Sequence, residues 1–306
     1  MRTELIEEIR KKISALKKEK NAIILAHNYQ LPEVQEIADF QGDSFELSRI
    51  AASSSADMIV FCGVDFMAES AKILSPSKKV LLPEREATCP MAQMVSAEAI
   101  KEYRKNHPDI EAVVAYINTT AEVKAVADVC CTSSSAVRIV KKISAKKILF
   151  VPDTNLGRWV ASQVPEKVIE LWPGFCPTHQ NLIKVDDVLR LKKQHPRAKV
   201  IAHPECSEEV IAIADAVLST SQMIAYAKDS KDDEFIVATE SGMAYALEKK
   251  VLQKKFYPVE DAICPNMKKT NLLSVLHALK DEEYEIILKG EIIEKARIPL
   301  ERMLAF

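Results

Sequence analysis

The chain alternates between short apolar runs and longer stretches in which apolar residues recur at helical spacing. The apolar runs are rich in β-branched side chains and are bounded by polar residues, which is typical of buried strands. They fall into three sets, and the predicted strands are 23–26, 58–61 and 80–82, then 113–115, 148–151 and 168–171, then 200–202, 235–238 and 256–259. Alternation of such strands with helices predicts an α/β fold with short parallel sheets.

A charged helical stretch precedes each set of strands, and further helices separate the strands within a set. The predicted helices are 4–19, 32–40, 45–53 and one beginning near 66, then 97–106, 123–127, 134–142 and one near 156, then 185–194, 210–214, 222–228 and one near 243. Residues 266–306 are also predicted to be helical, and we expect them to return to the first set.

The dipeptide Cys-Pro closes each set of strands, at residues 89, 176 and 264. An Asp and a later hydroxyl residue recur with the same period, as Asp39 and Ser44, Asp128 and Ser133, and Asp215 and Thr220. Such regularity indicates an internal repeat of three αβα units. We place them at residues 1–88 with 266–306, 89–175 and 176–265. We expect a pseudo-threefold arrangement with the active site on the axis between the units.

Composition narrows the class of protein. The chain has 306 residues and a net charge of −2, which gives no electrostatic reason to expect nucleic acid or an anionic membrane as partner. No apolar run approaches the length of a membrane span, and the N-terminal stretch lacks an apolar signal core. Seven cysteines without a signal peptide favour metal binding or catalysis over disulfides, and a reducing, cytoplasmic location.

The three Cys-Pro loops follow parallel strands, so Cys89, Cys176 and Cys264 are expected to meet at one point. Three cysteines can bind Zn²⁺ or an iron–sulfur cluster, and His179 could complete a Cys₃His zinc site. Structural zinc usually takes paired cysteines, however, and no Cys-x-x-Cys occurs here. A [4Fe–4S] cluster on three cysteines leaves one iron open as a Lewis acid. We favour this cluster over zinc and over cysteines with only a structural role.

Polar tripeptides end the first strand of each set, and they are His27-Asn28-Tyr29, Tyr116-Ile117-Asn118 and His203-Pro204-Glu205. With the repeated hydroxyl residues they predict a pocket below the cysteines. Glu205 is a candidate general base if burial raises its pKa, whereas the histidines and tyrosines could equally be core residues. The hydroxyl residues are predicted to cap helices and to offer donors to phosphate or carboxylate. The remaining cysteines are expected to be small buried residues, and they are Cys62, Cys130, Cys131 and Cys206.

Short motifs over nearly the whole chain carry a resemblance to a known family. They are Ala-His-Asn-Tyr-Gln at 26–30, Gly-Asp-Ser at 42–44, Gly-Val-Asp-Phe-Met-Ala-Glu at 63–69, Ala-Thr-Cys-Pro-Met-Ala at 87–92, Tyr-Ile-Asn at 116–118, Cys-Pro-Thr-His-Gln at 176–180, His-Pro-Glu-Cys at 203–206, Ser-Thr-x-Gln-Met at 219–223 and Cys-Pro-Asn-Met-Lys-Lys at 264–269. With these motifs the chain resembles the quinolinate synthases, iron–sulfur enzymes of de novo NAD biosynthesis.

The resemblance implies a transferase that condenses iminoaspartate with dihydroxyacetone phosphate to quinolinate, with loss of phosphate and two waters. It implies a [4Fe–4S] cluster on Cys89, Cys176 and Cys264, and functional coupling to an enzyme that produces iminoaspartate. The substrate-binding residues that it implies are His27, Tyr29, Ser44, Tyr116, Asn118, Ser133, His179, His203, Glu205 and Thr220. We assign catalytic roles to four of these, and they are Glu205, Tyr29, His27 and His203.

Two alternatives stay open at this point. The first is a hydro-lyase that uses the same open iron on another hydroxy acid and needs no phosphate site. The second is a zinc-stapled repeat protein that binds a partner and does no chemistry. Some members of the resembled family carry a Cys-x-x-Cys at the third cysteine, where this chain has Met267, so thiol–disulfide regulation is not expected there.

Overall fold

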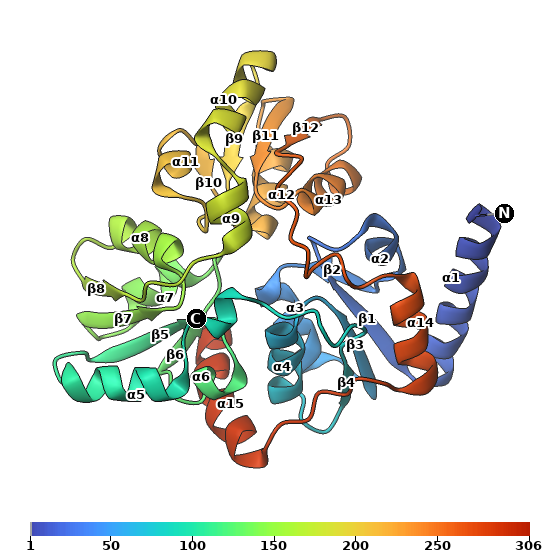
Figure 1. Ribbon diagram of the computed structural model, residues 1–306, viewed down its shortest axis with the longest axis horizontal. Helices are drawn as coiled ribbons and strands as arrows, with labels where there is room; N and C mark the ends of the chain where they lie inside the picture. The colour runs from blue at the N-terminus through green and yellow to red at the C-terminus, as the bar shows by residue number, and fades with distance from the viewer. Residues whose placement is uncertain (1) are drawn as a thin grey trace.

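The computed structural model describes residues 2–306, with side chains described from residue 4 onward. It contains three four-stranded parallel sheets, one from each predicted set of strands. Helices flank the sheets, and Figure 1 shows the three units at the corners of a triangle around a shared centre. The predicted α/β class with three αβα units is therefore confirmed.

The first sheet has the strand order β2-β1-β3-β4 and carries the N-terminal helix. Its elements are α1 (Arg2–Glu19), β1 (Ala22–His27), α2 (Pro32–Ile37), β2 (Phe40–Gly42), α3 (Ser44–Ser53), β3 (Met58–Cys62), α4 (Asp65–Leu74) and β4 (Lys79–Leu81).

The second sheet has the equivalent order β6-β5-β7-β8. A 3₁₀ turn, η1 (Met91–Gln93), directly follows the first Cys-Pro and leads into this unit. The other elements are α5 (Ala97–Asn106), β5 (Ala112–Tyr116), α6 (Ala121–Lys124), β6 (Val129–Cys131), α7 (Ala136–Lys142), β7 (Lys147–Val151), α8 (Thr154–Gln163) and β8 (Val168–Leu171).

The third sheet repeats the order as β10-β9-β11-β12, and a short helix that begins in the second Cys-Pro leads into this unit. The elements are α9 (Pro177–Leu182), α10 (Val185–Gln194), β9 (Lys199–Ala202), α11 (Glu208–Ala212), β10 (Ala216–Val217), α12 (Thr220–Asp229), β11 (Glu234–Ala238), α13 (Gly242–Lys250) and β12 (Lys255–Pro258). Two helices complete the chain, α14 (Leu272–Asp281) and α15 (Gly290–Ala305).

The strands that the apolar pattern missed are the edge strands β2, β6 and β10. Each is short and pairs with only the first strand of its unit. The repeated aspartates fix the turn before them, because the carboxylates of Asp39, Asp128 and Asp215 accept the amides of Ile24, Val113 and Val200 at 2.7–2.8 Å. The period of these aspartates therefore reflects sheet construction rather than chemistry.

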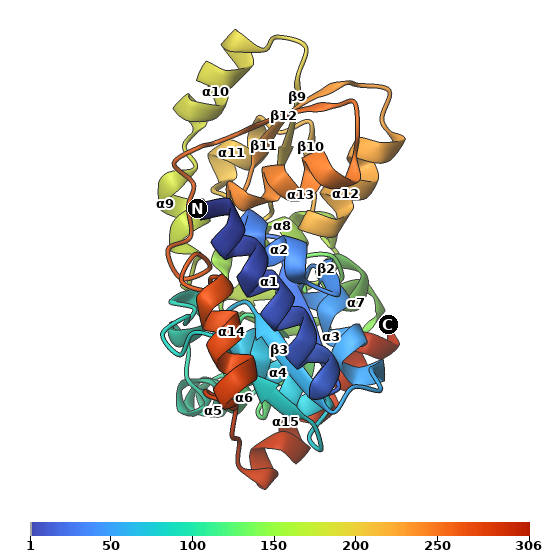
Figure 2. The same cartoon turned by 90° about the vertical axis from the view of Figure 1, so that its right-hand side faces the viewer.

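The C-terminal segment follows two separate paths. Helix α14 packs against α1 and β3 in the first unit (Figure 2). The chain then runs beside β4, where the amide of Ile286 donates to the carbonyl of Val80 at 2.8 Å. Helix α15 contacts α4 of the first unit and also α6 and β6 of the second. The proposed boundaries at residues 88, 175 and 265 stay a prediction.

One large hydrophobic cluster runs through all three units. Its fully buried members include Phe61 from the first sheet, Phe150 from the second and Phe235 from the third. Smaller clusters lie beneath α1 and α14 and beneath α10 and α11. Because the units share apolar packing, each depends on its neighbours for stability.

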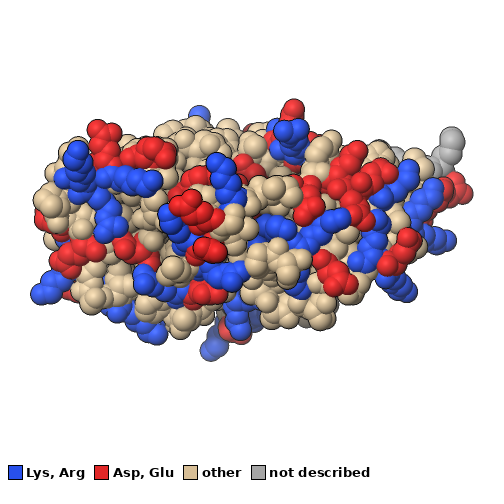
Figure 3. Space-filling view, turned by 90° about the horizontal axis from the view of Figure 1, so that it is seen from below, with Lys and Arg blue, Asp and Glu red and all other residues tan. Residues whose placement is uncertain are grey.

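The outer surface is mixed in charge. Figure 3 shows acidic and basic side chains interspersed over one face of the molecule. Within residues 2–306, none of the helices combines the length and the apolar character needed to cross a bilayer.

Candidate active site

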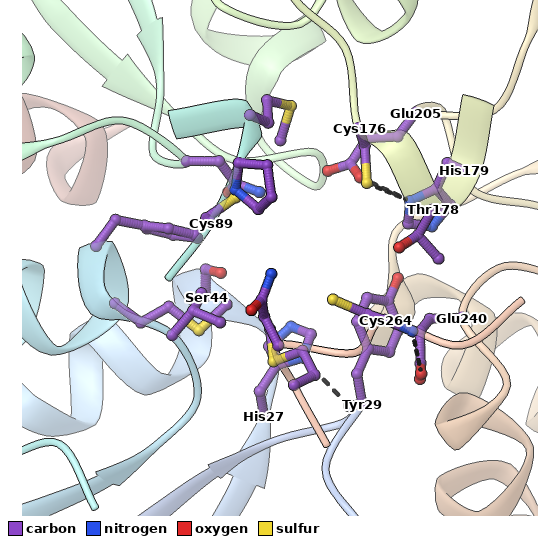
Figure 4. A pocket seen from close by; sticks show the side chains of 18 of the residues that line it. His27, Tyr29, Ser44, Cys89, Cys176, Thr178, His179, Glu205, Glu240 and Cys264 are labelled. Carbon is purple, nitrogen blue, oxygen red and sulfur yellow. Dashed lines mark hydrogen bonds and ion pairs between the residues drawn. The ribbon is translucent and has the colours of Figure 1, made fainter. Parts of the chain in front are cut away.

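The carboxyl ends of the sheets border a single cavity, which is where ligands bind in parallel sheets. Strand β1 ends at His27, β5 ends at Tyr116, and His203 directly follows β9. The cavity brings together every side chain that the sequence placed in the site, and they are His27, Tyr29, Ser44, Cys89, Tyr116, Asn118, Ser133, Cys176, His179, His203, Glu205, Thr220 and Cys264. Figure 4 shows several of them around the common opening.

The three cysteines reach the cavity from three separate loops, after β4, β8 and β12. Burial raises the pKa of the thiols of Cys89, Cys176 and Cys264. A buried thiolate needs a cation, so a metal centre is the natural partner for three such groups.

The spacing of the cysteines argues against a single zinc ion. Among the described residues, one group of potential ligands has all its donor atoms within 4.8 Å of one another, and it consists of Cys176, His179 and Glu205. Cys89 and Cys264 do not belong to this group. A tetrahedral Zn²⁺ on three cysteines would hold their sulfur atoms about 3.8 Å apart. At least one pair of the three sulfur atoms is therefore more than 4.8 Å apart, farther than one ion bound to all three would allow.

Glu205 is the best-connected acid of the cavity. Its carboxylate accepts the hydroxyl of Tyr116 at 2.5 Å and lies 2.9 Å from Nδ1 of His179. Burial alone would raise the pKa of Glu205, but the imidazoles of His179 and His203 and the Tyr116 hydroxyl outweigh it and hold this pKa below its ordinary range. The raised pKa that was the condition for Glu205 as a general base is therefore not found, and the side chain is a carboxylate at neutral pH.

His27 and His203 make the same local turn in different units. Nδ1 of His27 accepts the amide of Tyr29 at 3.2 Å, and Nδ1 of His203 accepts the amide of Glu205 at 3.3 Å. Burial is the main cause that lowers the pKa of each imidazole to about 3. Both rings are therefore neutral, and since Nδ1 is an acceptor, the proton is on Nε2. Nε2 of His203 lies 3.2 Å from the hydroxyl of Ser133.

A chain of hydrogen bonds links Tyr29 to Glu205. The Tyr29 hydroxyl and Oγ1 of Thr239 are 2.6 Å apart, and Oγ1 of Thr239 lies 2.8 Å from Nε2 of His179. The other ring nitrogen of His179 faces Glu205. Burial raises the pKa of Tyr29 and of Tyr116 well above the ordinary value, so both phenols stay protonated as donors.

The repeated hydroxyl residues are not the helix caps that the sequence predicted. Asp43 caps α3 by accepting the amides of Phe45 and Glu46 at 2.9 Å, and Ser219 caps α12. Ser44 and Thr220 instead open these two helices. Because a preceding residue does the capping, neither hydroxyl serves as a cap, and both lie next to the positive ends of ten-residue helices. The hydroxyl of Thr220 accepts the side-chain amide of Asn28 at 2.9 Å and can still donate.

The polar groups that line the cavity are neutral donors and acceptors together with three acids, Asp43, Glu205 and Glu240. The residues that line it include no lysine and no arginine. The carbonyl oxygen of Asn118 is buried and has no hydrogen-bond partner within the described part of the chain. A buried polar atom without a partner is costly, so it points to a ligand that would complete its bonding.

Comparison with known proteins agrees with this geometry. The family model described as quinolinate synthetase A protein matches residues 11–305. A protein named quinolinate synthase from Caldicellulosiruptor saccharolyticus is 54% identical over 98% of both chains. Proteins of the same name from Sulfurihydrogenibium sp. and Aquifex aeolicus are 55% and 52% identical, over 97% and 98% of this chain and 98% and 95% of theirs.

The chain belongs to the quinolinate synthetase A family. Three further acids of this chain lie beside the cysteine loops, and none of them was predicted as a site residue: they are Asp65, Asp153 and Glu240. Their signal was present, because they precede the cysteines by 24, 23 and 24 residues. Thr239 was also missed, since a lone threonine at a strand end carries no recognisable pattern.

The other cysteines of this family member lie outside the cavity lining and are buried, as expected. They are Cys62, Cys130, Cys131 and Cys206. The thiol of Cys206 donates at 3.3 Å to the carbonyl of Ala238, the last residue of β11.

Proposed function

We propose that this chain is a quinolinate synthase. In this reaction iminoaspartate and dihydroxyacetone phosphate combine to give quinolinate, one phosphate and two waters. The observation that carries the proposal is the convergence of three Cys-Pro loops on one cavity whose lining contains residues from each of the nine sequence motifs. Relatives named quinolinate synthase, at more than half identity over nearly the whole chain, support the same reaction.

We infer that Cys89, Cys176 and Cys264 hold a [4Fe–4S] cluster. The donor set fits, because three thiols surround one cavity and their spacing exceeds that of a single-ion site. When bound, the cluster supplies Lewis acidity at the iron that lacks a cysteine ligand. The Cys₃His zinc site has less support, since His179 lies close to Glu205 and shares a tight ligand group with only one of the three cysteines.

Glu205 is proposed to move protons during isomerisation and dehydration. As a carboxylate it can take a proton from a substrate carbon or nitrogen, and its low pKa lets it release that proton again. Tyr116 and His179 hold both carboxylate oxygens in place. These two contacts fix the orientation of the carboxylate, and so the path of proton transfer, before the substrate binds.

The remaining polar residues are proposed to bind and orient the substrates. Neutral His27 and protonated Tyr29 offer an N–H and an O–H to the triose part. Helix-opening hydroxyls and other neutral donors hold phosphate and carboxylates, and they are Ser44, Ser133, Thr220, Asn118 and His203. Anion binding by neutral donors and helix ends fits a cavity without lysine or arginine.

We further propose functional coupling to an enzyme that produces iminoaspartate, because this imine hydrolyses in water and needs rapid transfer. A reducing cytoplasm is the proposed location. The chain has seven cysteines and no disulfide among them, and three are proposed cluster ligands. In an oxidising compartment these thiols would be exposed to oxidation.

The test is an anaerobic assay of the reconstituted protein with dihydroxyacetone phosphate and with iminoaspartate formed in situ from oxaloacetate and ammonium. Quinolinate and phosphate are measured together and are expected in equal amounts. Phosphate retention with dehydration of another hydroxy acid would favour a hydro-lyase. A colourless protein containing zinc and no iron or sulfide would refute the proposal.

A further inference from the structure

Each cysteine loop is tied by a carboxylate to the sheet that it follows in the chain. The amide of Cys89 donates to Oδ1 of Asp65 at 3.1 Å, and the amide of Cys176 donates to Oδ2 of Asp153 at 3.2 Å. The amide of Cys264 donates to Oε1 of Glu240 at 3.1 Å. We call Asp65, Asp153 and Glu240 the anchor carboxylates.

The same carboxylates also hold the helix that follows the central strand of each unit. Asp65 accepts the amide of Phe66 at 2.8 Å, Asp153 accepts that of Leu156 at 2.6 Å, and Glu240 accepts that of Gly242 at 2.8 Å. Each anchor carboxylate therefore joins a helix start to a cysteine amide. Asp153 and Glu240 are fully buried.

We propose that the anchor carboxylates are positioning residues that hold the three thiols at the separation the cluster requires. This proposal rests on the cluster-binding part of the proposed function. A cubane tolerates little variation in the positions of its sulfur ligands. Because the anchor carboxylate fixes the backbone amide of the cysteine, the thiol can move only as far as the cysteine side chain allows. Groups that orient metal ligands in this way typically change metal retention about 10- to 100-fold when removed.

The test compares Asp153→Asn with wild type and with Asp215→Asn. In Asp153→Asn the amide group presents one oxygen and one NH₂, so either the Cys176 or the Leu156 amide loses its acceptor. Asp215→Asn is the matched control, because Asp215 also accepts a strand amide, that of Val200 at 2.8 Å, but contacts no cysteine loop. Asp65→Ala serves as a second anchor variant, because the amides of Phe66 and Cys89 both donate to Oδ1 of Asp65 and asparagine could keep both bonds. Asp65 is only partly buried, so the substitution is milder than one at Asp153.

Iron and sulfide are measured after anaerobic reconstitution, and iron release to a chelator is followed by the visible absorbance of the cluster. Release is expected to be about 10- to 100-fold faster in both anchor variants and within about twofold of wild type in Asp215→Asn. Thermal unfolding of the metal-free proteins identifies a variant that fails to fold. Unchanged release from a folded anchor variant would overturn the proposal, and so would equal acceleration in Asp215→Asn.

Hydrogen exchange of the metal-free proteins tests the anchoring role independently of cluster binding. The amide hydrogen of Cys176 is expected to exchange faster in Asp153→Asn than in wild type, as read from peptides that cover residues 174–178. Wild type that binds no iron and sulfide would refute the cluster and this proposal together. If wild type binds iron and sulfide, but amide exchange and cluster retention in the anchor variants equal those of wild type, only the anchoring role is refuted.

Discussion

Replacing Glu205 with glutamine tests the centre of the proposed chemistry. The carboxylate receives the Tyr116 hydroxyl at 2.5 Å on one oxygen and faces Nδ1 of His179 at 2.9 Å on the other. Glutamine keeps the volume but cannot take up a proton as a carboxylate does, and its NH₂ must face one of the two donors. Loss of acid–base catalysis costs about 10²- to 10⁴-fold in turnover, or about 2.7 to 5.4 kcal/mol in the barrier.

The assay is steady-state quinolinate formation at saturating substrates, with iron and sulfide measured on the same samples. Turnover is expected to fall in Glu205→Gln. Cluster content is expected to stay at the wild-type level, because among the described residues the Glu205 carboxylate accepts no hydrogen bond from a cysteine amide. Glu170→Gln is the matched control, since Glu170 also binds a tyrosine hydroxyl and a cation, Tyr103 and Lys147, but lies outside the cavity lining. Near-normal turnover in Glu205→Gln would remove Glu205 from the mechanism.

Three further predictions follow from the site. In the folded protein the pKa of His27 and of His203 is lowered to about 3, whereas the unfolded-state value is about 6.5. The protein is therefore most stable above pH 6.5 and loses stability as the pH falls towards 3. Urea unfolding of the metal-free protein should show a loss of about 2 kcal/mol per histidine between pH 7 and pH 5. Cys264→Ser should abolish stoichiometric iron and sulfide binding and quinolinate formation. Lys268→Met should cost about 3–5 kcal/mol in urea unfolding, since it leaves the buried carboxylate of Glu240, 2.8 Å from the ammonium, without its cation.

Each of these predictions has its own control. The double variant His27→Gln/His203→Gln should lose most of the pH dependence between pH 7 and pH 5, and an unchanged slope would contradict the assignment to these rings. Cys62→Ala should bind as much iron as wild type, because Cys62 is a buried sheet residue. Glu240→Gln/Lys268→Met should recover part of the stability lost in Lys268→Met, and strict additivity would contradict the pairing.

The sequence predicted the position of the site well because its signals are local and repeated. His27, Tyr116 and His203 stand where short apolar runs end, and in parallel sheets such ends meet at one edge. The Cys-Pro period then located the three loops that face the same edge. The edge strands escaped prediction because they are very short: β2 and β6 have three residues each and β10 has two.

Properties that depend on contacts between units could not be predicted in the same way. Burial alone gives the wrong direction for the pKa of Glu205, because two of the groups that lower it are distant in the sequence: Tyr116 belongs to the second unit, and His179 lies 26 residues before Glu205. The role of Ser44 depended on which of two adjacent polar residues caps α3, and only backbone geometry decides that. The path of α15 against the second unit likewise depends on packing rather than pattern.

The corresponding strand-end positions Tyr29, Asn118 and Glu205 now hold a phenol, an amide and an acid. Triplication supplied three copies of each position, so one copy could change its side chain while the others kept the architecture intact. In such a scaffold the residues that determine the chemistry are separate from those that determine the fold. Redesign for a new substrate would therefore change these three side chains and keep the shared sheets and helices.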